Sequence, residues 1–157
     1  MTHYEFVTFW EFDAQLEKVW KEIRDVDAWP AWWPYVKSVS IVRQGNADDI
    51  GSIRKIVWTT ALPYTISFET ELIAIEPMQR MEGLAVGELT GRGIWSFRRE
   101  SQKTMVTYKW SVYTTRKWMN LLAPIARPLF KWNHDKVMEG GYEGLKKRLQ
   151  LISLTKI

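Results

Sequence analysis

The sequence has no cysteine and only two histidines among its 157 residues. Without cysteine the chain forms no disulfide, has no thiolate nucleophile and lacks the thiolate ligands of a structural zinc site. Carboxylates occur singly or along faces that we expect to be exposed, so we expect no metal site and no cofactor. Thiol and transition-metal chemistry are therefore excluded as expected functions.

Long apolar runs are also missing. No segment approaches the roughly 18 residues that a membrane span requires. The first residues, MTHYEFVTFWEF, lack the basic start and continuous apolar core of a signal peptide. We therefore expect a soluble, cytoplasmic protein.

Acidic residues are scarce in the last quarter of the chain. Residues 116–157 contain nine Lys/Arg and three Asp/Glu, a charge of +6, whereas residues 1–115 carry −2. The simpler interpretation is a solvated helix face with long basic side chains. The other is transient contact with an anionic membrane surface or an acidic partner. We expect no nucleic-acid binding, because the basic residues do not alternate with stacking aromatics, and GELTGRG precedes a strand rather than a phosphate-binding helix.

Aromatic residues, in contrast, are abundant, at 14% of the chain with ten tryptophans. This is more large apolar surface than a plain core of this length needs, so the core is either bulky or surrounds a ligand. Three of the tryptophans, Trp29, Trp32 and Trp33, lie between or beside two prolines in DAWPAWWPYV. They either plug an open end of the fold or contact a ligand directly.

The spacing of apolar residues predicts the order of elements. Alternation predicts a strand at 3–12, and helical spacing after Asp13, which we place at the N-cap, predicts a helix at 14–25. DAWPAWWPYV predicts one helical turn with Pro30 at an early position. A short stretch, WMNLLA, and a long helix at 128–152 end the chain. Between them, turn signals separate six strand-length runs at 35–44, 51–60, 64–76, 79–87, 92–100 and 103–115.

This order resembles the helix-grip fold of the START-like (SRPBCC) superfamily, an α+β class in which a curved seven-stranded antiparallel sheet is covered by two short helices and a long C-terminal helix. The stretch FDAQLEKVWKEIRDVDAWPAWWPYVKSV resembles the opening of this superfamily. Two others are similar to a bacterial polyketide cyclase/dehydratase-like branch: EPMQRMEGLAVGELTGRGIWSF and TYKWSVYTTRKWMNLLAPIARPLFKWNHDKVMEGGYEGLKKRL. The resemblance implies one domain over residues 1–157. It also implies a cavity between sheet and helix that holds lipids, steroids, aromatic polyketides or hormones. It implies no shared catalytic motif.

Strand alternation and the last helix supply the candidate cavity residues. The inner positions of three strands alternate with charged positions such as Glu69, Arg98 and Lys109. In the helix, Gly140, Gly141 and Gly144 predict either a close approach to the sheet or open volume beside it. The candidate ligand-binding residues are Trp33, Tyr64, Phe68, Trp95, Tyr108, Trp110, Phe130, Asn133, His134 and Met138. A filled core is the alternative for several of them.

Four residues are candidates for chemistry on a ligand. His134 can orient a ligand or move protons, although we favour a structural histidine bonded to the sheet backbone or to a tyrosine. Arg80 and Glu82 lie on one strand face and can polarise a carbonyl, although we favour a surface pair. Tyr64 can supply a hydroxyl.

The sequence thus predicts a protein that binds or transports a hydrophobic small molecule or lipid. The alternative is a metal-free polyketide cyclase/aromatase or dehydratase-like enzyme acting on an apolar substrate, because confinement and modest acid–base help can suffice for such ring closures. A third interpretation is a membrane-surface module that uses the basic C-terminal helix and tryptophans as interfacial anchors.

Overall fold

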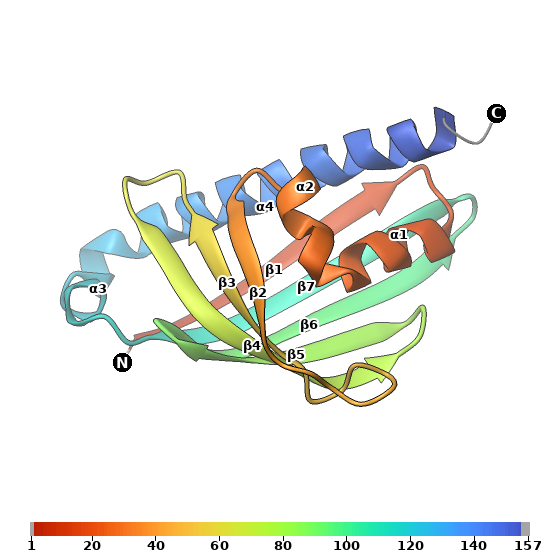
Figure 1. Cartoon of the computed structure of the whole chain (residues 1–157). Helices are drawn as coiled ribbons and strands as arrows, with labels where there is room; N and C mark the ends of the chain where they lie inside the picture. The colour runs from red at the N-terminus through yellow and green to blue at the C-terminus, as the bar shows by residue number, and fades with distance from the viewer. Residues whose placement is uncertain (1, 155–157) are drawn as a thin grey trace.

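The computed structural model describes residues 2–154, which form one curved antiparallel sheet with helices on its open side (Figure 1). The strand order is β1-β7-β6-β5-β4-β3-β2. The long helix α4 runs along the sheet, and the short helices α1 and α2 cover one end of it (Figure 1). The predicted helix-grip architecture is confirmed. The elements are β1 (Thr2–Phe12), α1 (Leu16–Arg24), the 3₁₀ turn η1 (Val26–Ala28), α2 (Trp29–Trp32), β2 (Val36–Arg43), β3 (Ile53–Thr59), β4 (Thr65–Glu76), β5 (Arg80–Gly87), β6 (Leu89–Glu100), β7 (Lys103–Thr114), α3 (Lys117–Leu121) and α4 (Ala123–Leu154).

The predicted N-cap of the first helix was wrong. α1 begins at Leu16 with Gln15 at the N-cap position, whose side chain makes no capping bond. The preceding residue is held by the sheet instead, because the Thr104 hydroxyl on β7 donates to the Ala14 carbonyl at 2.7 Å. The helix therefore starts only after this anchored segment, and its N-cap position is two residues beyond Asp13.

The long helix begins earlier than predicted. α4 starts at Ala123 and includes Pro128. A proline inside a helix has no N–H to donate to the carbonyl four residues back, so that hydrogen bond is lost. Here that carbonyl belongs to Pro124 in the first turn of the helix, so only one bond near the end is lost. The proline-containing stretch therefore continues the helix.

The strand β6 also begins earlier than predicted, because GELTGRG is largely strand. The turn is confined to Gly87, at φ 136°, and Glu88. Gly91 and Gly93 lie inside β6 and face β7. A Cβ on Gly91 would lie 2.1 Å from the Ser111 carbonyl oxygen, and one on Gly93 would lie 2.7 Å from the Tyr108 hydroxyl. These glycines therefore make room for the neighbouring strand and its rings.

The glycines of α4 let this helix lie close to α2 and to the residues that follow α2. They neither bring α4 closer to the sheet nor leave open volume beside it. A Cβ on Gly144 would lie 1.8 Å from the Trp32 carbonyl oxygen, and one on Gly141 would lie 2.5 Å from the Trp33 ring. The Trp33 Nε1 also donates to the Val137 carbonyl at 2.8 Å. Because of this contact α4 is fixed against the tryptophan-rich segment.

Within residues 2–154, no helix has both the length and the apolar character needed to cross a membrane.

Candidate ligand-binding site

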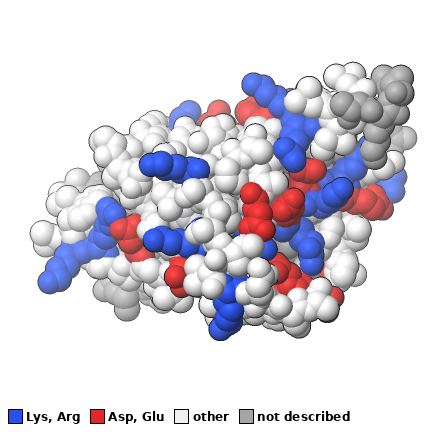
Figure 2. Space-filling model, viewed as in Figure 1, with Lys and Arg blue, Asp and Glu red and all other residues white. Residues whose placement is uncertain are grey.

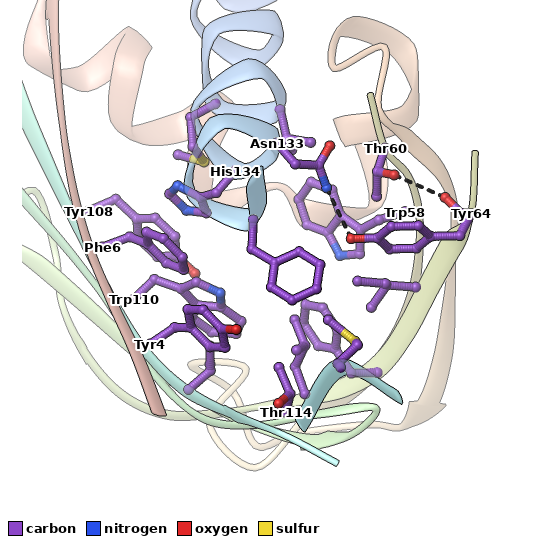
Figure 3. Close-up of a pocket in the computed structure, with 18 of the residues that line it drawn as sticks. Tyr4, Phe6, Trp58, Thr60, Tyr64, Tyr108, Trp110, Thr114, Asn133 and His134 are labelled. Carbon is purple, nitrogen blue, oxygen red and sulfur yellow. Dashed lines mark hydrogen bonds between the residues drawn. The ribbon is translucent and has the colours of Figure 1, made fainter. Parts of the chain in front are cut away.

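A cavity of about 130 Å³ lies between the concave face of the sheet and α4. Figure 3 shows its wall, in which rings from the sheet face the helix. Strand β1 contributes Tyr4 and Phe6, and β3 contributes Trp58. At the end near α3 the wall includes Met119, which is buried. The inner positions of several strands thus converge on one largely apolar space.

All ten candidate cavity residues line this space. For the candidates in β4, β6 and β7, alternation predicted which side chains point inward, because the opposite positions of these strands carry charges that stay outside. Of the three tryptophans near the prolines, Trp29 and Trp33 line the cavity, whereas Trp32 stacks on Trp33 with ring centroids 5.5 Å apart. The tryptophan segment is therefore a plug whose inner surface is also cavity wall.

The candidate set from the sequence omitted Tyr4, Phe6, Trp58 and Thr60, which also line the cavity. The signal for the first two was present, since they share one face of the first strand. Their register completes the placement, because Tyr4 pairs with Val112 and Phe6 with Trp110. Both partners lie on the inner face of β7.

Asn133 lines the cavity but its amide group is already bonded. Its Oδ1 accepts from the Ala61 backbone N–H at 2.8 Å, and its Nδ2 donates to the Tyr64 hydroxyl at 3.3 Å. The Thr60 hydroxyl in the same turn donates to the Tyr64 carbonyl at 3.0 Å. Asn133 therefore ties α4 to the turn between β3 and β4 and closes this side of the cavity (Figure 3).

The two ring nitrogens of His134 are buried but, contrary to the favoured prediction, they make no hydrogen bond. Neither ring nitrogen has a partner in the described residues. The nearest carboxylate oxygen, on Asp135, lies 3.7 Å from Nδ1, which is beyond hydrogen-bond distance. The ring instead stacks on Phe6, with centroids 4.1 Å apart and planes 11° apart. Packing between rings, not hydrogen bonding to the sheet, holds this histidine.

Burial also makes the polar groups of the wall uncharged. Desolvation lowers the pKa of His134 from 6.5 to about 4, against an opposing effect of Asp135. Desolvation raises the pKa of Tyr108, and it raises the pKa of Tyr64 although the Asn133 hydrogen bond opposes the shift. At neutral pH these groups are thus neutral donors and acceptors.

Arg80 and Glu82 do not line this cavity. The Glu82 carboxylate is 2.9 Å from the Arg80 guanidinium and 2.9 Å from that of Arg92 on β6. Their positions in β5 alternate with Met81, which packs in the core. The pair is therefore not the surface pair that the sequence favoured, because Glu82 is buried and lines the smaller cavity described next, outside the main one.

A smaller cavity of about 90 Å³ adjoins the first, with Trp58, Trp95 and Trp110 in the wall common to both. Its far side is polar and includes Arg54. This guanidinium pairs with Asp27 and Asp49 at 2.8 Å each, and the hydrogen bond that it donates to Asp27 is the main reason its pKa is raised. Among the described residues, no three His, Asp or Glu side chains are grouped to hold a metal ion.

Solved structures with this fold include proteins of several kinds. The Zhui aromatase/cyclase from Streptomyces sp. R1128 has a TM-score of 0.77 at 12% identity, over 95% of this chain and 94% of that one. A START superfamily protein from Mycobacterium smegmatis has a TM-score of 0.77 at 16% identity, over 96% and 99% of the two chains. The di-domain ARO/CYC protein BexL from the BE-7585A biosynthetic pathway has a TM-score of 0.74 at 14% identity, over 94% of this chain and 50% of its own.

These identities establish the fold alone, and no curated protein matches the sequence significantly. The family model described as polyketide cyclase / dehydrase and lipid transport matches residues 4–150, which include the cavity-lining part of α4 and all but the first two residues of the sheet. The chain therefore belongs to the polyketide cyclase / dehydrase and lipid transport family.

Proposed function

We propose that this protein binds and carries a small apolar molecule that bears a polar atom. The supporting observation is where unpaired polar atoms lie. Five buried side-chain nitrogen or oxygen atoms in the described residues have no hydrogen-bond partner, and four of them are in the cavity wall. These are the Tyr4 hydroxyl, Trp58 Nε1 and both nitrogens of His134. Since buried polar groups are normally paired, a hydroxyl or carbonyl of a ligand is their expected partner.

The size of the cavity limits the ligand. An apolar cavity of roughly 150 Å³ accepts a benzene-sized molecule, and the space here is about 130 Å³. The closed form therefore suits one aromatic ring or a short alkyl chain. A longer ligand requires either a change in the aromatic wall shared with the second cavity or a movement of α4.

The experiment begins with native mass spectrometry of protein purified from its own source, which identifies any bound molecule. Quenching of tryptophan fluorescence then measures affinity for the single-ring probes iodobenzene and 4-iodophenol, of which only the second carries a hydroxyl. V112F fills the cavity, because Val112 lines it and is buried. V7F makes the same substitution on β1, where Val7 is 53% exposed. We expect V112F to lose binding of both probes and V7F to keep it.

V112A provides a second check if V112F folds poorly. Removing two methyl groups from the wall enlarges the cavity, so V112A is expected to accept a larger ring than the wild type does. Equal probe affinities for the wild type, V112F and V112A, with all three folded, would show that the ligand binds elsewhere. Protein that carries no molecule from its source and binds neither probe contradicts the proposal.

The alternative is a cyclase or dehydratase-like enzyme, favoured by the fold shared with an aromatase/cyclase and by a cavity able to confine a folded chain. Efficient proton transfer near neutral pH needs a group with a matching pKa. Burial lowers the pKa of His134 to about 4, which makes it a weak base, and this favours the carrier. Recovery of the bound molecule unchanged after prolonged incubation supports a carrier, whereas recovery of a cyclised or dehydrated product supports the enzyme.

A further inference from the structure

A continuous apolar surface lies on α3 and the first turns of α4. Its side chains are 41% or more exposed, and two of them, Leu121 and Ile125, are 82% and 84% exposed. Isolated exposed apolar residues are normal, but a contiguous group marks an interaction surface. Three members recur at helical spacing along one side of α4. We name it the α3–α4 face, and it consists of Trp118, Leu121, Leu122, Ile125, Leu129 and Trp132.

The segment that carries this face contains charged residues of one sign only. Residues 116–132 contain four Lys/Arg and no Asp/Glu. Lys117, Arg127 and Lys131 are exposed beside the apolar side chains. The acids that approach them lie outside this stretch, since Asp135 pairs with Lys131 at 2.7 Å and Glu88 pairs with Arg116. In Figure 2 the end of the molecule that carries α3 is largely uncharged surface, with Lys or Arg side chains and, beside them, Asp or Glu at its margin.

The α3–α4 face adjoins the ligand cavity. The Trp118 ring packs against Tyr64 at 5.7 Å and against Phe130 at 6.1 Å between centroids, and both partners line the cavity. On the same short helix Met119 is buried in the cavity wall. The exposed apolar surface and the cavity therefore lie on opposite sides of helix α3.

We propose that the α3–α4 face docks on an anionic lipid membrane. Tryptophan and leucine side chains enter the interface between headgroups and acyl chains, while lysine and arginine side chains reach anionic headgroups. A second copy of the chain fits less well, because a symmetric contact would bring two sets of like charges together. Docking in this orientation puts the Trp118 end of the cavity against the bilayer. Passage of an apolar ligand between bilayer and cavity at that end rests on the proposed function, whereas docking itself does not.

Co-sedimentation with vesicles of phosphatidylcholine, with and without phosphatidylglycerol, tests the proposal at low and high salt. The wild type is expected to bind the phosphatidylglycerol vesicles, and less so at high salt because salt screens the headgroup charge. L121S/I125S is expected to lose binding. I41S/V42S is the matched control, since Ile41 and Val42 are 48% and 52% exposed on the distant edge strand β2.

The charge requirement is tested with K117Q/K131Q against K55Q/K109Q, which makes the same change in net charge on the sheet. Each lysine near an anionic surface contributes enough that losing two weakens binding roughly thirty-fold. The control pair is expected to bind as the wild type does. Equal binding by both pairs contradicts the proposal, and so does wild-type protein that binds no vesicle. A wild-type dimer that L121S/I125S converts to a monomer also overturns it, by assigning the face to self-association.

The cavity-filled variant V112F separates this proposal from the proposed function. Because Val112 is buried in the cavity wall and away from the face, V112F is expected to bind vesicles normally. Vesicle binding without ligand binding in the wild type would leave docking standing and remove the carrier role. Ligand binding without vesicle binding would do the reverse.

Discussion

Acidification is expected to destabilise this protein through His134. Burial lowers the pKa of this residue to about 4, whereas in the unfolded chain it has the ordinary value near 6.5. Between these values the unfolded state binds the proton more readily than the folded state does. The stability associated with the neutral, buried ring is therefore fully present above pH 6.5 and is lost as the pH falls toward 4.

The size of this loss follows from the difference between the two pKa values. It amounts to about 2 kcal/mol at pH 5 and about 3 kcal/mol at pH 4. For a domain with a total stability of roughly 5–15 kcal/mol this is a large fraction. Urea unfolding followed by tryptophan fluorescence at a series of pH values measures the free energy of unfolding and its slope.

H134F isolates this contribution from that of the carboxylates. A phenylalanine keeps the stack on Phe6, whose centroid lies 4.1 Å from that of His134, but it cannot be protonated. We expect the wild type to lose about 3 kcal/mol more than H134F between pH 7 and pH 4. Parallel stability curves for the two proteins would refute the argument, because the histidine would then titrate alike in both states.

Two further predictions concern α4. G144A is expected to be destabilised by about 2 kcal/mol, although alanine favours helix, because its Cβ would lie 1.8 Å from the Trp32 carbonyl oxygen. In G140A the added Cβ meets only the edge of the half-buried Tyr35 ring, at 2.7 Å, so this variant is expected to lose less stability in urea unfolding. A G144A protein as stable as G140A would contradict the close contact between Gly144 and the Trp32 carbonyl. Asn133→Ala removes the bonds to the turn between β3 and β4 and is expected to speed both association and dissociation of 4-iodophenol in stopped-flow fluorescence. Unchanged rates would mean that this side does not open.

The alternation of apolar and charged residues predicted which side chains face the cavity in those strands where one face carries charge. In β7, Lys109 is exposed between Tyr108 and Trp110, so the inner side is unambiguous. In β1 both faces carry apolar residues, and Val7 and Phe9 are exposed although they are hydrophobic. Glu5 and Glu11 mark the outer face of the first strand, but the apolar residues between them weaken this signal.

Glycine positions and hydrogen bonds depend on distant parts of the chain, which limited prediction from the sequence. GELTGRG has the composition of a turn, but Gly93 is needed because the Tyr108 hydroxyl and the Trp110 ring lie where its side chain would be. Similarly, the absence of a partner for His134 follows from its stack on Phe6 in the first strand. Neither contact leaves a local pattern.

The two ends of the cavity differ in how they are closed, and this indicates where a ligand enters. At the tryptophan end, opening would separate Gly144 from the Trp32 carbonyl, break the bond from Trp33 to Val137 and expose a Trp33 side chain that is 1% exposed. At the α3 end the turn between β3 and β4 is tied to α4 by the two hydrogen bonds of Asn133. Breaking these costs about 2 kcal/mol at about 1 kcal/mol each. That cost keeps an open form within the roughly 0.1–10% range of accessible minor states. The end of the cavity that opens at least cost is thus the end that adjoins the α3–α4 face.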